Sequence, residues 1–122
     1  MRRIVTSEKI DAPSMASGAE LRCPRCGSAN LHHLTVTIFN RAEDEVMIWR
    51  TAVEHRRVET TQVVSLETEN PSPRRHGMTI KFECEECCRD PATDVLELNL
   101  WQHKGATLLN WRYAEIGSAP KV

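Results

Sequence analysis

The amino-acid sequence predicts a mainly β protein, in which an antiparallel sheet forms a small sandwich or an open barrel built onto a metal site. Three observations lead to this prediction. Apolar and β-branched residues alternate with a period of two along several segments, and polar links rich in Gly and Pro separate those segments. Two CxxC pairs of cysteines lie far apart in the chain and match the spacing of zinc ligands.

Six segments are expected to form strands. Residues 31–40 give the clearest signal, because three aliphatic side chains fall on one face and two threonines on the other. The acidic link at 41–45 is expected to turn the chain into a hairpin with the next strand. The other candidate segments are 45–59, 60–69, 78–84, 94–101 and 107–113.

Two regions leave alternatives open. Residues 42–56 could form a helix instead, because the continuous apolar run at 46–49 does not by itself distinguish a buried strand from a helix. Ile4 and Val5 could add a short edge strand to an N-terminal segment that otherwise lacks periodic apolar patterning.

Size and composition indicate one globular domain. The chain has 122 residues, of which 40% are hydrophobic and 27% charged, an ordinary make-up for a folded domain. We expect residues 1–20 to form a flexible leader, residues 21–116 to form a single β-rich domain, and residues 117–122 to form a tail. Sixteen Lys and Arg against seventeen Asp and Glu give a net charge of −1, so no global basic field steers the protein onto nucleic acid.

The distribution of apolar residues favours a soluble protein. No apolar run approaches the length of a membrane span, and the first residues lack the apolar centre of a secretory signal. We therefore expect a cytoplasmic protein. In that reducing compartment the five cysteines are expected to hold metal rather than to form disulfides.

The two CxxC clips are Cys23 with Cys26 and Cys84 with Cys87. Together they offer four thiolates in the tetrahedral arrangement that Zn²⁺ prefers in closed structural sites, so one structural Zn²⁺ is expected. Gly27 suits the left-handed residue that often ends such a turn. Buried free cysteines and a redox CxxC are the alternatives, although a redox pair normally lies at a helix start in a βαβ setting that this sequence lacks.

The segment CPRCGS, residues 23–28, resembles the metal knuckle that opens the fold of the zinc-ribbon superfamily, where a second CxxC on a later hairpin completes the site. The chain is also similar to small uncharacterised zinc-ribbon proteins of bacterial plasmids and phages. The resemblance covers the two clips and residues 31–39. It implies a structural zinc ion but no particular activity, because ribbons serve many functions.

The chain departs from a minimal ribbon in two ways. Between Cys26 and Cys84 lie 57 residues, where about 15–20 would be usual, and we interpret the excess as an inserted sheet. The second clip also lacks a following glycine. Cys88 stands at that position and is the alternative to Cys87 as a ligand.

Five residues outside the clips are candidates for binding a partner. Trp101, His103 and Lys104 surround a turn, where an aromatic ring and basic groups could stack on a base and contact a phosphate. The favoured alternative is a hairpin turn whose tryptophans complete the core. Arg74 and Arg75 lie on a proline-rich loop and could bind phosphates or an acidic protein surface, or could simply be solvated.

Catalytic motifs are missing from the sequence. It contains no HExxH, GxSxG, phosphate-binding or dinucleotide-binding motif, and four cysteines would leave a zinc ion no open position. We therefore expect a non-enzymatic, zinc-stabilised interaction protein, with a protein partner favoured by the near-neutral charge. The alternatives are a nucleic-acid-binding ribbon that uses Arg74, Arg75, Trp101 and Lys104, and a small enzyme around His103. An exposed strand edge could also support a homodimer.

Overall fold

The computed structural model describes residues 3–65, 69–87, 90 and 92–116 of the chain. The described residues form nine strands and no α-helix. None of their elements is a helix capable of spanning a membrane. The strands are β1 (Ile4–Ser7), β2 (Ser14–Met15), β3 (Gly18–Ala19), β4 (Leu31–Asn40), β5 (Met47–Glu54), β6 (Arg57–Val64), β7 (Gly77–Cys84), β8 (Leu96–His103) and β9 (Ala106–Ala114).

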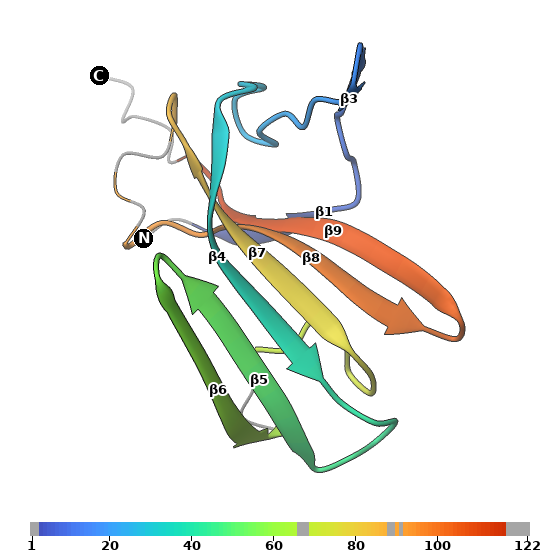
Figure 1. Ribbon diagram of the computed structural model, residues 1–122. Helices are drawn as coiled ribbons and strands as arrows, with labels where there is room; N and C mark the ends of the chain where they lie inside the picture. Colours follow the sequence, from blue (N-terminus) through green and yellow to red (C-terminus); the bar gives the residue numbers. More distant parts are fainter. Residues whose placement is uncertain (1–2, 66–68, 88–89, 91, 117–122) are drawn as a thin grey trace.

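Seven of the strands form one antiparallel sheet with the order β1-β9-β8-β7-β4-β5-β6 (Figure 1). Strands β2 and β3 make a separate two-stranded ribbon. The predicted class, a mainly β protein with an antiparallel sheet, is confirmed. The large sheet is open, with β1 at one edge and β6 at the other, and does not close into a barrel.

The central strands follow the sequence pattern closely. Strand β4 has the predicted bounds, and it pairs with β5 in the hairpin that the acidic link predicts. Residues 47–54 are a strand, so the helical alternative for 42–56 is wrong. The expected single strand over 45–59 is instead interrupted by a tight turn at His55, which has a positive φ of 54° and begins a second hairpin, β5 with β6.

The N-terminal segment contributes to the sheet edge. Residues Ile4–Ser7 pair with β9, in agreement with the edge strand suggested by Ile4 and Val5. The ribbon formed by β2 and β3 has no counterpart in the sequence-based prediction, since strands of two residues carry no periodic signal. The division into leader, domain and tail stays a prediction.

Two small cores form on opposite faces of the sheet. The first surrounds Trp111, which is fully buried and lies with Cys23, Cys84 and Leu96 at the end of the sheet near the cysteines. The ring of Phe82 meets Trp111 edge-on, with ring centroids 5.6 Å apart. The segment that carries the first cysteine clip therefore covers this end of one sheet face.

The second core lies on the other face. Phe39 and Ile48 are fully buried there, and Phe39 lies near Asn70 and Pro71 of the loop that precedes β7. Arg41 fastens that loop, because its guanidinium donates to the carbonyl oxygens of Glu45 and Pro73 at 2.8 Å each. The close packing also explains Gly77, since a Cβ at this position would lie only 2.9 Å from the ring of Pro71.

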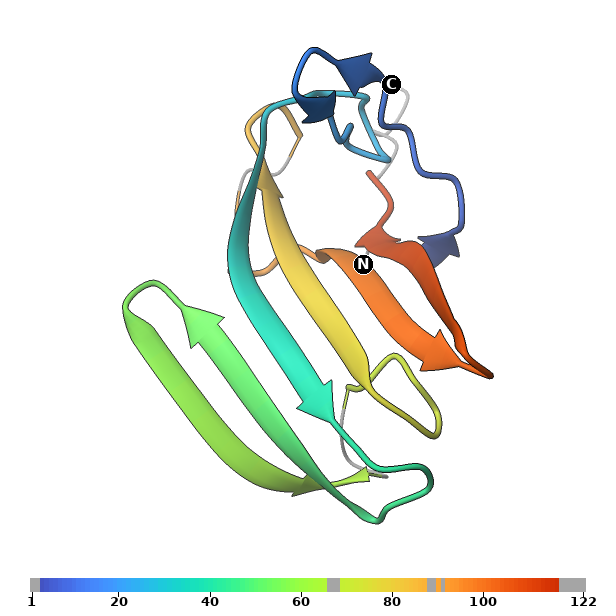
Figure 2. The ribbon, with the colours of Figure 1, turned by 45° about the vertical axis from the view of Figure 1, so that its right-hand side comes forward.

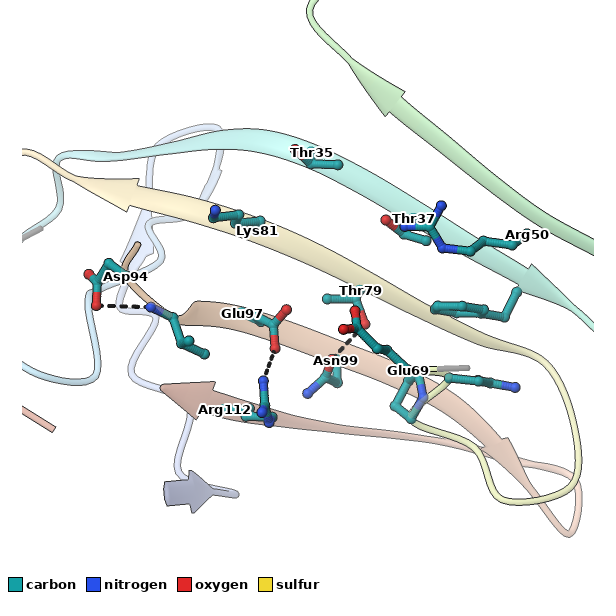
Figure 3. A pocket seen from close by; sticks show the side chains of 14 residues that line it. Thr35, Thr37, Arg50, Glu69, Thr79, Lys81, Asp94, Glu97, Asn99 and Arg112 are labelled. Atoms are coloured by element: carbon teal, nitrogen blue, oxygen red, sulfur yellow. Dashed lines mark hydrogen bonds and ion pairs between the residues drawn. The ribbon is translucent and has the colours of Figure 1, made fainter. Parts of the chain in front are cut away.

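The two faces differ sharply in polarity. Residues that pair across neighbouring strands share a face, so the register gives one continuous apolar row over six strands. That row consists of Val58, Val53, Val36, Ile80, Leu98 and Trp111. On the opposite face, polar side chains from five strands line an open cavity of about 660 Å³ (Figure 3).

Candidate metal centre

The first cysteine clip is a tight turn immediately before β4. The amide of Gly27 donates to the carbonyl oxygen of Cys23 at 2.9 Å, and the amide of Cys23 donates to the carbonyl oxygen of Ser28 at 2.8 Å. Gly27 has a φ of 79°, the left-handed conformation predicted for it and one that side chains with a Cβ adopt reluctantly. This turn holds both cysteines of the clip on its inner side.

The second clip begins at the last residue of β7. Cys84 pairs with Leu31, the first residue of β4, and the amide of Glu85 donates to the carbonyl oxygen of Asn30 at 3.1 Å. Because β4 leaves the first clip and β7 enters the second, their antiparallel pairing brings the two clips together. This explains how 57 intervening residues are compatible with one site: β5, β6 and the following loop are inserted between two paired strands.

The four predicted cysteines converge on one point. The sulfurs of Cys23 and Cys87 are 3.6 Å apart, those of Cys26 and Cys84 are 3.5 Å apart, and all four lie within 4.8 Å of one another. All four are free thiols rather than disulfides. Cys23 and Cys84 are buried, whereas Cys26 is exposed, so the cluster could hold one metal ion near the surface.

Without an ion the four thiols influence one another. Burial opposes ionisation of Cys84, but backbone amides of Cys87 and Glu86 and the neighbouring thiols outweigh it and lower the pKa of Cys84 to about 7. Burial, together with the thiols of Cys23 and Cys84, raises the pKa of Cys87. Burial also raises the pKa of Cys26. The raised pKa values of Cys87 and Cys26 oppose their ionisation beside neighbouring thiols, and a bound cation would supply the missing positive charge.

A buried ion pair fixes the first clip to the sheet. Arg25, which lies between the two cysteines of the clip, donates to both carboxylate oxygens of Asp94 at 2.9 and 2.6 Å and to the carbonyl oxygen of Ala114 at 3.0 Å. The side chains of Arg25 and Asp94 are 0% and 3% exposed. Burial opposes the charge of Arg25, yet Asp94 and the thiols of Cys87 and Cys23 raise its pKa, so a cation stands beside the sulfurs.

Histidines are outside the cluster. Among the described residues the cluster contains cysteines alone. His32, which follows the first clip, is exposed and interacts with Glu85 through its Nε2 at 2.9 Å. The alternative ligand Cys88 lies outside the described residues, and Cys87 occupies the fourth position.

The predicted partner-binding residues lie at the opposite end of the sheet. Arg74 contacts both Glu43 and Asp44, and Arg75 contacts Glu43, at distances of 2.7 to 2.9 Å. The hydrogen bond from Arg74 is the main reason why the pKa of Asp44 is lowered. The acidic link between β4 and β5 therefore pairs with these two arginines at the protein surface.

The other three candidates lie on the neighbouring hairpin. Trp101 is half-buried, whereas His103 and Lys104 are exposed at the β8–β9 turn. The backbone amide of Gln102 donates to the carbonyl oxygen of His76, so this hairpin adjoins the loop with the arginines. The five residues thus share one region, in which the arginine charges are already paired with carboxylates.

Sequence reasoning missed two features. The ion pair between Arg25 and Asp94 joins residues 69 positions apart in the sequence, and no local sequence pattern predicts it. The polar cavity is built from single residues on five adjacent strands, among them Thr35, Lys81 and Glu97 (Figure 3). The alternation along each strand could have shown which residues share this face, but not which strands are neighbours.

Comparisons of the chain with protein-family models, curated proteins and solved structures give no match. The fold and the site therefore define the class directly. The chain is a mainly β protein with an open antiparallel sheet and a cluster of four cysteines that could hold a metal ion.

Proposed function

We propose that this protein is a non-enzymatic, zinc-stabilised interaction protein of zinc-ribbon type, and that one face of its sheet binds another protein. The single observation that carries the proposal is an apolar sheet face that the described segments cover only at the end near Trp111. The metal centre supports it, because it fastens the sheet at one end without offering a reactive position.

The spacing of the sulfurs fits zinc. With Zn–S bonds of about 2.3 Å, the ligands of a tetrahedral site lie roughly 3.8 Å apart. The shortest sulfur–sulfur distances, 3.5 and 3.6 Å, and the upper limit of 4.8 Å fall on either side of that value. Thiolates are the ligands that zinc binds well, and four of them close its coordination sphere. These properties favour a structural role over a catalytic one.

The charge balance is also favourable. A zinc ion with four thiolates carries a net charge of −2, and the Arg25 guanidinium stands beside two of the sulfurs. Because ligands from both clips are needed, metal binding would contribute directly to folding. The ion would keep the ends of β4 and β7 together.

The apolar face has the composition of a docking surface. Counting members of the row that ends at Trp111, it carries six aliphatic or aromatic residues that are each at least 40% exposed. They are Ile38, Met47, Trp49, Val53, Val58 and Leu109. Contiguous exposed apolar surface on a folded protein is typical of an interaction site, whereas single exposed apolar residues are common and carry no such meaning.

Native mass spectrometry before and after chelation tests the metal part of the proposal. We expect one zinc ion per chain, lost on chelation. Cys87→Ala should lose the ion, and Cys88→Ala should keep it. A metal-free protein that is fully folded, or a Cys87→Ala variant that retains zinc, would contradict the proposal.

Site-specific photocrosslinking in the native cell tests the docking face. A crosslinking amino acid at Trp49 reports on the apolar face, and one at Leu108 reports on the opposite face with an exposed fraction of 39%. We expect a defined protein adduct from position 49 only. Equal labelling from both positions, or nucleic acid as the adduct, would refute docking of a protein on this face.

A further inference from the structure

We propose that the apolar face is covered by a second copy of the same chain, so that two sheets pack face to face as a symmetric β-sandwich. The inference rests on the proposed function, because it names the partner of the same surface. Its observation is the combination of a partly uncovered sheet face, the absence of Asp, Glu, Lys and Arg side chains of strands β4–β9 from that face, and an open area close to that of a specific interface.

Only part of the sheet's apolar face is covered by a second layer of the described chain. Protein domains bury a sheet's apolar face against another layer, either a helix or a second sheet. Here the segment with the first cysteine clip covers only the end of the face near Trp111. Toward β5 and β6 no segment of the described chain covers the face in either view of the ribbon (Figures 1 and 2), and Val58 at its far side is 69% exposed. A second sheet about 10 Å away would complete the layer.

The size of the face is adequate. Six strands spaced about 4.8 Å apart span roughly 24 Å, and six to eight residues at about 3.3 Å each extend roughly 20–26 Å. One whole face thus has a planar area of about 500–600 Å², and the segment with the first cysteine clip already covers its end near Trp111. Two faces without their covered ends bury somewhat less than about 1,000–1,200 Å², which is close to the minimum of about 1,000 Å² expected of a specific protein–protein interface.

The charge pattern favours self-association. By the observed register, every Asp, Glu, Lys and Arg within strands β4–β9 projects from the opposite, polar face. In a two-fold symmetric dimer the same surface of both copies is in contact. A charged surface would therefore be repelled by its copy, whereas an uncharged surface is not. A strongly acidic or basic partner would find no complementary group on this face.

The metal end restricts the arrangement. The first cysteine clip rises from one end of the apolar face, where it packs against Trp111 and Cys84. Two faces can approach only when the clips lie at opposite ends of the sandwich. Each clip then borders the far end of the partner's sheet, and the two copies run antiparallel.

Size-exclusion chromatography with light scattering on the full-length, zinc-loaded chain provides the test. We expect a species of twice the 13.9 kDa chain mass. Ile38→Lys and Leu109→Lys should each weaken dimerisation at least about a hundredfold, because a buried unpaired charge is strongly unfavourable. Leu108→Lys is the matched control, since Leu108 and Leu109 are 39% and 40% exposed but point to opposite faces.

Zinc content and circular dichroism establish that each variant folds, and crosslinking from position 49 gives a second readout on the unmutated face. A chain-to-chain adduct from that position supports the inference. A wild-type monomer at about 100 µM, where even weak dimers associate, or a dimer that Ile38→Lys and Leu109→Lys leave intact, would overturn it. A monomer whose position 49 crosslinks to a different protein would refute the homodimer and leave the proposed function standing.

Discussion

Replacing Asp94 by Asn provides a stringent test of the packing around the metal centre. The substitution keeps the shape of the side chain but removes its charge, and it leaves the guanidinium of Arg25 buried without a carboxylate. Both partners are almost fully buried and are joined by two hydrogen bonds of 2.9 and 2.6 Å. Breaking one side of such a pair typically costs 3–5 kcal/mol, so we expect a loss of about 3–5 kcal/mol in the free energy of unfolding.

Urea denaturation of the zinc-loaded protein measures this loss, with Glu115→Gln as the matched control. Glu115 also holds an arginine, Arg3, through two hydrogen bonds, but that pair is exposed, with side-chain exposures of 75% and 42%. Exposed pairs contribute little, so the control should change stability much less than Asp94→Asn. If the two variants lost equal stability, burial would not be the reason for the strength of the Arg25–Asp94 pair.

Two further predictions concern the loop before β7. Gly77→Ala should destabilise the protein by roughly 1–3 kcal/mol in urea denaturation, because the added Cβ would clash with Asn70 and Pro71. Unchanged stability would show that the loop can move to accommodate the Cβ. Arg74→Gln should raise the NMR titration midpoint of the Asp44 carboxyl toward 3.8, since Arg74 lowers that pKa in the folded protein. The Asp44 contribution to stability is therefore present above pH 3.8 and lost on further acidification, and an unchanged midpoint would contradict the pairing.

The sequence predicts the strands well where their two faces differ. Strand β4 alternates aliphatic and threonine side chains, and its observed bounds coincide with the predicted ones. Strands β5 and β6 were less well predicted, because the boundary between them depends on a turn at His55 without Gly, Asn or Pro. Such a turn lacks the residues by which hairpins are usually detected.

The candidate metal centre was predictable because its ligands carry a local signal. Each CxxC clip is recognisable from the spacing of its two cysteines within four residues. The two clips could therefore be assigned to one site without knowledge of the fold. The Arg25–Asp94 pair and the polar cavity gave no such signal, since their members come from distant parts of the chain that meet only when strands β9, β8, β7, β4 and β5 lie side by side. The sequence pattern does not predict the order of the strands in the sheet. That order determines which distant residues come into contact.

The metal centre and the proposed dimer interface belong to one apolar layer. The row of side chains from Val58 to Trp111 crosses six strands without a polar interruption. Val58 at one end is 69% exposed, whereas Trp111 at the other end is fully buried. Four cysteines and the segment around them cover the buried end, and the metal ion that this cluster could hold would replace part of a core there. The described part of this segment does not reach the end of the face near Val58, which stays exposed. In the proposed dimer a partner sheet would cover that open end, as the cysteine segment covers the other, because a sheet buries its apolar face against a second layer.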